Sequence, residues 1–203
     1  MTTKQPLAQS PSGLAGVIFG KMMEWVNTES YRKAIAALHP SSKECYLEIG
    51  FGTGLLAEML LSNTSDIVVA GVDPSATMLQ TAIKRLSKRG FSGRVDFRQG
   101  TDENLNWNDQ YFDAVIAVHC FQFWGKPEHT IKEISRILKP NGRIVFVFRD
   151  HSSKPPSWLP NPISRSGQEV DQAIEMLKEN DYTATEYPSA GSSRVIRAVR
   201  RPC

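Results

Sequence analysis

The chain has 203 residues, with 24 Lys or Arg and 21 Asp or Glu, which gives a formal net charge of +3. This length suits a single domain with a sizeable core, and so mild a charge does not by itself indicate a nucleic acid or membrane partner. The three cysteines are widely spaced, so neither a disulfide framework nor a zinc cluster is indicated, and no bound metal is expected. Because no signal-peptide pattern and no apolar run of roughly 18 residues is visible, we expect a cytoplasmic protein without a membrane span.

The amino-terminal part predicts a polar leader and two helices. Residues 1–13, rich in Ser and Pro, are expected to be disordered. Four apolar residues then recur with the spacing of a helical stripe, at Phe19, Met22, Met23 and Val26. A second helix is expected over residues 31–38, ending before His39-Pro40.

From residue 45 onward, strand patterns and helix patterns alternate. Strands are expected at residues 45–49, 66–73, 94–100, 112–119 and 143–150. Helices are expected at residues 55–61, 74–90 and 126–142, the last ending in a turn at Asn141-Gly142. Such alternation predicts a parallel sheet covered on both faces, with a ligand crevice at the carboxyl ends of its strands.

The last part of the chain departs from this alternation. Ser166 can cap a helix over residues 167–180, and two strand-like runs follow at residues 182–187 and 193–200. The gap between the runs is too short for a crossover helix, so they should pair antiparallel, and the second, Arg-rich run is interpreted as a solvated edge strand. The predicted fold is α/β: a Rossmann-like seven-stranded sheet, mostly parallel with an antiparallel C-terminal strand, and helices on both faces.

The segment YLEIGFGTG, residues 46–54, places three glycines at alternate positions directly after the first strand. Gly50 permits a tight turn, Gly52 lets the chain pass close to a ligand, and Gly54 lets the following helix sit close to the strand. Asp73 ends the second strand, where a carboxylate can accept hydrogen bonds from both hydroxyls of a ribose. The alternative is an acid that only favours the helix N-terminus beside Pro74.

Glu48 narrows the choice of ligand. The dinucleotide fingerprint is G-x-G-x-x-G with a pyrophosphate at the helix N-terminus, whereas this turn is G-x-G-x-G preceded by Glu48. An acid at that place would repel pyrophosphate but can receive an ammonium group. A ligand with an amino group and a ribose points to S-adenosylmethionine.

Four stretches, in this order and spacing, carry a family resemblance: LEIGFGTG, GVDPSATML, QGTDENLNWNDQYFDAVIAV and EISRILKPNGRIVFVF. Over roughly residues 14–203 the sequence resembles the class I S-adenosylmethionine-dependent methyltransferases. The resemblance implies one methyltransferase domain, with a helical lid (14–40), a cofactor-binding core (43–150) and a C-terminal helix with an antiparallel strand pair (151–203). It implies S-adenosyl-L-methionine as cofactor and S-adenosyl-L-homocysteine as product.

The resemblance also implies which residues hold the cofactor. Glu48 and the glycines would line its methionine part, Asp73 its ribose, and Pro74 with Met78 its adenine. The full implied set is Glu48, Gly50, Gly52, Thr53, Gly54, Asp73, Pro74, Met78, Thr101, Asp102, Glu103 and Val118. Many relatives have Gly-Asp where this chain has Gly100-Thr101, so Asp102 is either an adenine contact or a helix cap.

Candidates for the acceptor side follow the fourth strand, in HCFQFW. His119 and Gln122 are the candidate catalytic residues, and the aromatic residues there can pack an apolar substrate. Alternatively, these aromatics are core and His119 is a satisfied, half-buried histidine. Arg149 and Asp150 are expected to form surface or hinge pairs. The remaining substrate candidates are Phe19, Met22, Trp25, Phe123, Trp124, His151 and Trp158.

These features predict a methyltransferase acting on a small, partly apolar molecule by in-line displacement. Nucleic acid is disfavoured because HCFQFW lacks the Asn or Asp, two prolines and aromatic residue of base-modifying relatives. One alternative is a protein that binds S-adenosylmethionine without transferring methyl, such as a cyclase-like enzyme or a regulatory module. Another is a nicotinamide-dependent oxidoreductase, against which Glu48 and the glycine spacing argue. The oligomeric state is open.

Overall fold

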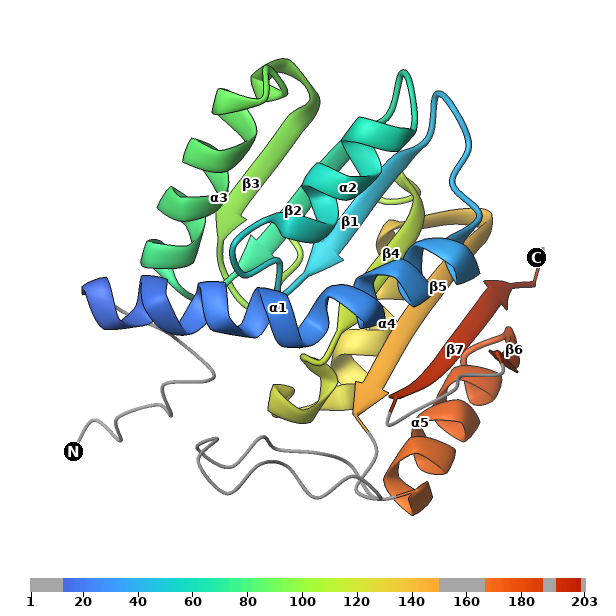
Figure 1. Ribbon diagram of the computed structural model, residues 1–203. Helices are drawn as coiled ribbons and strands as arrows, with labels where there is room; N and C mark the ends of the chain where they lie inside the picture. The colour runs from blue at the N-terminus through green and yellow to red at the C-terminus, as the bar shows by residue number, and fades with distance from the viewer. Residues whose placement is uncertain (1–12, 150–166, 188–192, 202–203) are drawn as a thin grey trace.

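The structure is a computed structural model that describes residues 13–149, 167–187 and 193–201, except the side chains of residues 14, 15 and 19. One seven-stranded sheet organises these residues, in the order β3-β2-β1-β4-β5-β7-β6 (Figure 1). The strands are β1 Cys45–Ile49, β2 Val68–Asp73, β3 Val95–Gln99, β4 Phe112–Val118, β5 Leu138–Arg149, β6 Tyr182–Tyr187 and β7 Ser193–Arg200. The helices are α1 Gly13–Leu38, α2 Leu55–Asn63, α3 Ala76–Lys88, η1 Ser92–Arg94, η2 Phe121–Phe123, α4 Pro127–Ile137 and α5 Gly167–Glu179.

The pairing of the strands confirms the predicted fold class. β3, β2, β1, β4 and β5 are parallel neighbours, and β7 pairs antiparallel with both β5 and β6. The parallel strands therefore all end at the same edge of the sheet, where the glycine turn follows β1 and Asp73 closes β2.

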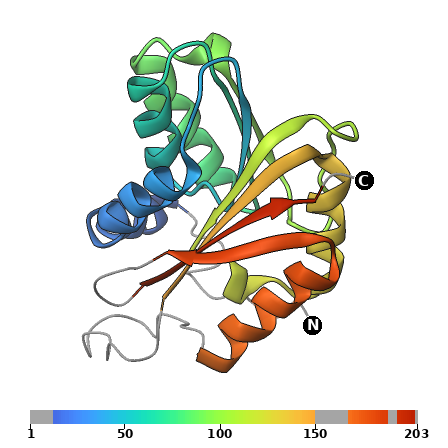
Figure 2. The ribbon, with the colours of Figure 1, turned by 90° about the vertical axis from the view of Figure 1, so that its right-hand side faces the viewer.

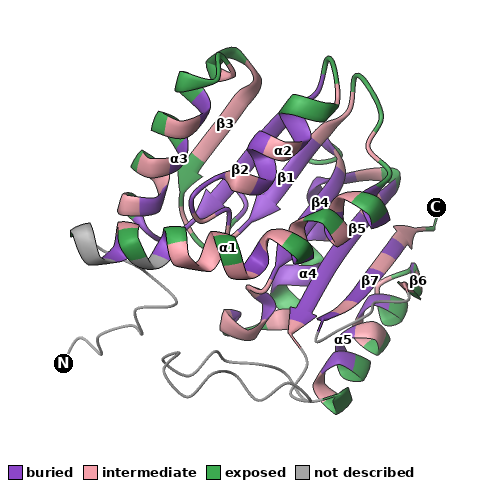
Figure 3. Ribbon diagram, viewed as in Figure 1, coloured by how far each residue is buried: buried purple, intermediate pink, exposed green. Residues whose placement is uncertain are grey.

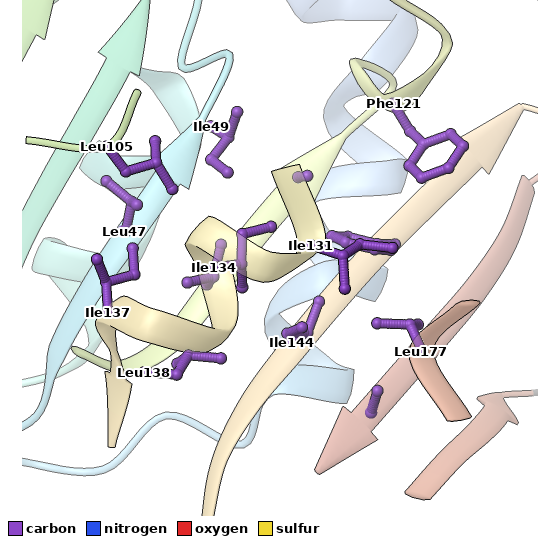
Figure 4. Close-up of a cluster of buried hydrophobic side chains, with 14 of the residues drawn as sticks. Leu47, Ile49, Leu105, Phe121, Ile131, Ile134, Ile137, Leu138, Ile144 and Leu177 are labelled. Carbon is purple, nitrogen blue, oxygen red and sulfur yellow. The ribbon is translucent and has the colours of Figure 1, made fainter. Parts of the chain in front are cut away.

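Helices cover both faces of the sheet, as the apolar strands require. α1, α2 and α3 lie on one side, and α4 and α5 lie on the other (Figure 2). Under α4 and α5, Ile131, Ile134 and Leu177 pack with sheet residues such as Leu47 and Ile144 (Figure 4). The central strands β1, β2 and β4 are almost wholly buried, whereas the edge strands β3 and β6 are partly exposed, as are the outer faces of the helices (Figure 3).

The amino-terminal helix differs from the prediction, because α1 is one continuous helix of 26 residues where the sequence predicted two. No Gly or Pro lies between Lys21 and Leu38, so nothing in the backbone forces a break. Arg143 fixes its carboxyl end: Nε donates to the Leu38 carbonyl at 2.7 Å and Nη1 to Glu44 Oε1 at 2.8 Å. From there α1 crosses the face of the sheet over β4 and β5, and its amino-terminal half passes the carboxyl ends of β1 and β2 (Figure 1).

Two strand predictions are also corrected. β7 lies between β5 and β6 and not at an edge, so β6 is the outer strand. β5 begins at Leu138, before the predicted turn, because the pairing with β4 skips from Leu138 to Arg143 and leaves a bulge. Asn141, with φ of 61°, lies in this bulge, as its predicted role in a turn requires.

Some expectations cannot be compared with the structure. The leader up to residue 12, the cap at Ser166 and the Pro-rich loop lie outside the described residues, and the proposed domain boundaries stay predictions. Within the described ranges, no helix combines the length and the apolar character that crossing a membrane needs.

Candidate functional site

The glycine turn between β1 and α2 has the backbone that the sequence predicted. Gly50, Gly52 and Gly54 have φ of 75°, 52° and 77°, in the left-handed region that favours glycine. A methyl group on Gly50 would lie 2.9 Å from Cys120 Cβ, and one on Gly54 would lie 2.9 Å from Ala82 Cβ of α3. The close approach at Gly54 is thus to α3 and not to the preceding strand. At Gly52 nothing lies within 4 Å, so the turn faces open space there.

Asp73 holds this turn to the end of β2. Its Oδ2 accepts the backbone N–H of Gly52 at 2.9 Å, and its Oδ1 accepts that of Ser75, also at 2.9 Å. The side chain is buried, and burial raises the pKa of Asp73 to about 6 although both hydrogen bonds oppose this change. Each oxygen keeps a lone pair beyond these bonds, so the carboxylate can accept two further donors.

Glu48 is the second buried carboxyl group at this edge. It is 2% exposed, and its Oε2 has no hydrogen-bond partner among the described residues. Burial, and then the charge of Asp73, raise the pKa of Glu48 well above its usual range. Tyr31 of α1 lies near it, since burial and then the charge of Glu48 raise the pKa of Tyr31. A buried acceptor without a donor is costly, which makes Glu48 a site for a cationic or donating group.

α1 covers the glycine turn. A methyl group on Gly20 would lie 2.9 Å from Thr53 Cγ2 and 3.3 Å from Met78 Sδ, so this glycine allows the helix to pass closely over both. Arg85 of α3 fastens the arrangement, because it donates to the Thr53 carbonyl, to Glu58 of α2 and to Glu24 of α1 at 3.0, 2.8 and 2.5 Å. Residues from α1, α2, α3 and the turn are therefore joined by one guanidinium.

The predicted adenine contacts fall into different surroundings. Met78 is buried with Phe51 and Ala82, and Pro74 is half-buried with its carbonyl accepting from Gln99 at 3.1 Å. Val118 is 8% exposed at the end of β4, and Thr101 and Glu103 are exposed.

Asp102 Oδ2 accepts the Thr130 hydroxyl of α4 at 2.6 Å. No helix occurs in residues 101–111, so the alternative of a helix cap at Asp102 is wrong. The carboxylate instead ties this loop to α4.

His119, directly after β4, lies beneath α1. Its φ of 53° is unusual for a residue with a side chain. Nε2 lies 2.8 Å from Ser30 Oγ of α1, while the buried Nδ1 has no partner in the described part of the chain, so the expectation of a satisfied histidine is only half met there. Burial, and then the charges of Arg149 and Lys33, lower the pKa of His119 to about 3, which keeps the ring neutral at physiological pH.

The other acceptor-side candidates are divided between core and surface. Gln122 Nε2 donates to the His119 carbonyl at 2.5 Å. Phe121 and Trp124 are 5% exposed and pack against each other and Phe146, as the core alternative predicted.

Phe123 and Met22 are half-buried. Trp25 is 82% exposed on α1, and its contact with a substrate stays a prediction. His151, Trp158 and the side chain of Phe19 lie outside the described part.

Sequence reasoning missed the polar residues that α1 and β5 bring to this place. Arg149 Nη2 donates to Asn27 Oδ1 at 2.7 Å, while the surface or hinge pairs expected of Arg149 and Asp150 stay a prediction, because Asp150 lies outside the described residues. Ser30 Oγ also lies 3.3 Å from Ser193 Oγ of β7. The only signal was that Asn27 and Ser30 are polar residues in an otherwise apolar helical pattern. Among the described residues no cluster of acids, histidines and cysteines suits a metal ion.

Comparison with known proteins agrees with this geometry. Residues 47–146 match the family model described as "Methyltransferase domain". The chain is 31% identical over 133 residues to an uncharacterized methyltransferase of Bacillus subtilis, covering 66% of this chain and 71% of that protein. It is 29% identical to the demethylmenaquinone methyltransferase of Thermotoga maritima, covering 80% of each. Of other relatives it spans a smaller part, such as 37% of a Paenibacillus malonyl-[acyl-carrier protein] O-methyltransferase.

Solved structures share the fold. A SAM-dependent methyltransferase from Aquifex aeolicus has a TM-score of 0.68 at 16% identity, covering 83% of this chain and 88% of that one. The [4+2]-cyclase SpnF has a TM-score of 0.73 at 17% identity, covering 86% and 81%. At such identities the likeness concerns the fold alone, which here supports different chemistries.

Proposed function

Because the chain belongs to the class I S-adenosylmethionine-dependent methyltransferases, we propose that it methylates a small, partly apolar acceptor. Membership of this family sets aside the nicotinamide-dependent oxidoreductase. The observation that carries the proposal is the pair of buried carboxyl groups, Glu48 and Asp73, on either side of the glycine turn.

The residues at the turn fit the cofactor. Glu48 Oε2 is a buried acceptor without a donor, which suits the amino group of the methionine part. Asp73 keeps lone pairs for two ribose hydroxyls after its two backbone hydrogen bonds. The open space at Gly52 allows a ligand to approach the backbone. Glu48, Gly52 and Asp73 would therefore hold the cofactor, and the adenine contacts of Pro74, Met78, Thr101, Asp102, Glu103 and Val118 stay predictions.

When bound, S-adenosylmethionine supplies a sulfonium methyl group that a nucleophile displaces in line, leaving S-adenosylhomocysteine. The protein contributes position and exclusion of water. α1, fastened by Arg85 to the turn and to α2, covers this part of the crevice. His119 and Gln122 are proposed to position the acceptor. With a pKa of about 3, His119 serves as a neutral hydrogen-bonding group and is a poor general base near neutral pH.

A small acceptor is supported by the cover that α1 forms over His119 and Arg149. Half-buried Phe123 and Met22 supply apolar surface for it. The Thermotoga maritima relative is named for demethylmenaquinone, itself a small molecule. A cytoplasmic location belongs to the same proposal.

The test is methyl transfer from S-[methyl-³H]adenosylmethionine to a panel of small phenols, quinols, amines, thiols and carboxylic acids. Labelled product with an equal amount of S-adenosylhomocysteine supports the proposal, provided Asp73→Asn lowers both when S-adenosylmethionine is subsaturating. Binding of S-adenosylhomocysteine without transfer to any class of acceptor would favour the alternative of a non-methylating protein that binds the cofactor. No binding would contradict the site itself.

A further inference from the structure

Arg149 is the last residue of β5, at the edge of the sheet where the glycine turn between β1 and α2 (the cofactor turn) also lies. It alternates along β5 with Phe148 and lies on the same face as Val147, which packs in the core under α1. Its side chain is half-buried and meets Asn27 of α1. The guanidinium thus lies between the sheet and α1, next to His119.

Among the described residues this guanidinium has no counter-charge. Its one hydrogen bond among the described residues joins Nη2 to the neutral amide oxygen of Asn27 at 2.7 Å, and no described carboxylate forms an ion pair with it. Burial lowers the pKa of Arg149, whereas Arg143 and Arg194, which pair with carboxylates, have raised pKa values. A partly desolvated cation without an anion is unfavourable unless something supplies the negative charge.

The neighbours of Arg149 are donors, or groups that can act as donors. Ser30 and His119 share a hydrogen bond of 2.8 Å, and Ser193 pairs with Arg149 across β5 and β7. Lys33 adds a second positive charge close enough to lower the pKa of His119. Nε and Nη1 of Arg149 have no hydrogen-bond partner among the described residues, and Nη2 uses only one of its two N–H groups for Asn27. One edge of the planar fork, formed by Nη2 with either Nε or Nη1, is therefore left for a bidentate ligand.

We propose that this is an anion subsite, and that the methyl acceptor carries a carboxylate or phosphate group which Arg149 binds through the remaining edge of its guanidinium. Asn27 orients the guanidinium from α1. The apolar part of the acceptor then lies toward Phe123, and its nucleophile toward the cofactor turn. The identification of the ligand as an acceptor rests on the proposed function, but the anion subsite itself does not.

The test is an NMR titration at pH 7.5 with three probes of similar shape: benzoate, phenyl phosphate and neutral benzyl alcohol. Each is measured with and without S-adenosylhomocysteine, against the wild type, Arg149→Gln and Arg149→Lys. The matched control is Arg194→Gln, since Arg194 is an arginine on the neighbouring strand already paired with Glu186 and Asp171.

We expect benzoate or phenyl phosphate to bind wild type at least about tenfold more tightly than benzyl alcohol, with the stronger of the two showing which anion the subsite prefers. Arg149→Gln should abolish this preference, Arg149→Lys should restore part of it, and Arg194→Gln should not change it. Equal affinity for benzoate, phenyl phosphate and benzyl alcohol, or an unchanged preference in folded Arg149→Gln, would overturn the subsite.

Binding of S-adenosylhomocysteine to the same variants tests the proposed function separately from the anion subsite. It should be retained in Arg149→Gln, since Arg149 lies outside the cofactor turn. If wild type fails to bind it, the proposed function fails, and the titration without it still supports or overturns the anion subsite.

Discussion

The carboxylate of Asp73 accepts the backbone N–H of Gly52 at 2.9 Å. This hydrogen bond joins the end of β2 to the turn after β1, so a single acid both shapes the glycine turn and faces the ligand. A change at Asp73 therefore acts on the turn and on the ribose contact together, and a variant of the same shape is needed to keep the fold.

Asp73→Asn should weaken S-adenosylhomocysteine binding by about 10- to 100-fold, because hydrogen bonds to a charged group contribute about 1.5–3 kcal/mol. The fold should persist with some loss of stability, since the substitution removes a buried charge but keeps an acceptor for only one of the backbone N–H groups of Gly52 and Ser75. Isothermal titration calorimetry checks the affinity and circular dichroism the fold. Asp66→Asn is the control, because Asp66 is exposed and distant in the loop before β2. Unchanged affinity in Asp73→Asn would show that the ribose lies elsewhere.

Gly52→Ala should separate strain from ligand contact. Its φ of 52° makes a side chain unfavourable by about 1–2 kcal/mol, and its open side is where the ligand is expected. Gly90→Ala carries the same strain, at φ 78° and also with open space, but lies after α3. Both variants should lose similar thermal stability, and only Gly52→Ala should lose S-adenosylhomocysteine affinity. Equal affinities for the two variants would argue against the ligand approaching Gly52.

The pH dependence of the empty protein and of ligand binding should run in opposite directions. Burial raises the pKa of Asp73 to about 6, above its ordinary value of about 3.9. The folded state therefore keeps a proton that the unfolded state loses, so this group's contribution to the free energy of unfolding falls by roughly 3 kcal/mol between pH 4 and 6. It changes little above that range.

Binding requires the ionised acceptors, and so S-adenosylhomocysteine affinity should rise from pH 5 to 7. Glu48, whose pKa is raised further, extends the rise. Calorimetry in buffers of different ionisation enthalpy should detect protons released on binding. An affinity that is constant over this range would mean that neither carboxyl group meets the ligand.

Glu24→Gln should loosen the amino-terminal half of α1. Glu24 and Arg85 form a shielded ion pair, with side chains 16% and 21% exposed. Loss of this ion pair should lower the free energy of local opening of α1 by about 1 kcal/mol. Amide hydrogen exchange in residues 13–24 should therefore become roughly fivefold faster. Glu29→Gln is the matched control on the same helix, since Glu29 and Arg32 are 65% and 66% exposed. Equal exchange in the two variants would show that Arg85 does not hold α1 down.

The sheet could be predicted almost completely from local patterns. β1 begins at Cys45 and ends at Ile49 as expected, and the antiparallel C-terminal pair followed from a short gap. The order of the strands in the sheet was harder to predict from the sequence. An Arg-rich pattern such as that of β7 suggests an exposed edge, yet these arginines are on an inner strand, where Arg194 pairs with Glu186 and Asp171.

The cofactor half of the site could be predicted from the sequence because its residues are close to one another along the chain. Gly50, Gly52 and Gly54 follow one another, and Asp73 ends the very next strand. The acceptor half is assembled from α1, β4, β5 and β7, so Asn27, Arg149 and Ser193 meet only in the folded chain. A sequence shows that Arg149 is charged, but its burial and the neutral partner it receives depend on tertiary structure.

The continuity of α1 has a mechanical consequence. The hydrogen bond from Arg143 to the Leu38 carbonyl holds the carboxyl end of the helix. Gly20 lies about 18 residues from Leu38, which is roughly 27 Å at 1.5 Å per residue. Because α1 is one stiff helix, a tilt of about 10° about its Leu38 end would move Gly20 by roughly 5 Å, and it would break the hydrogen bonds of Glu24 to Arg85 and of Asn27 to Arg149. The same helix carries Gly20 over the cofactor turn and Asn27 over Arg149. A movement of α1 would therefore open the cofactor site and the acceptor site together, and the ion pair between Arg85 and Glu24 would oppose it.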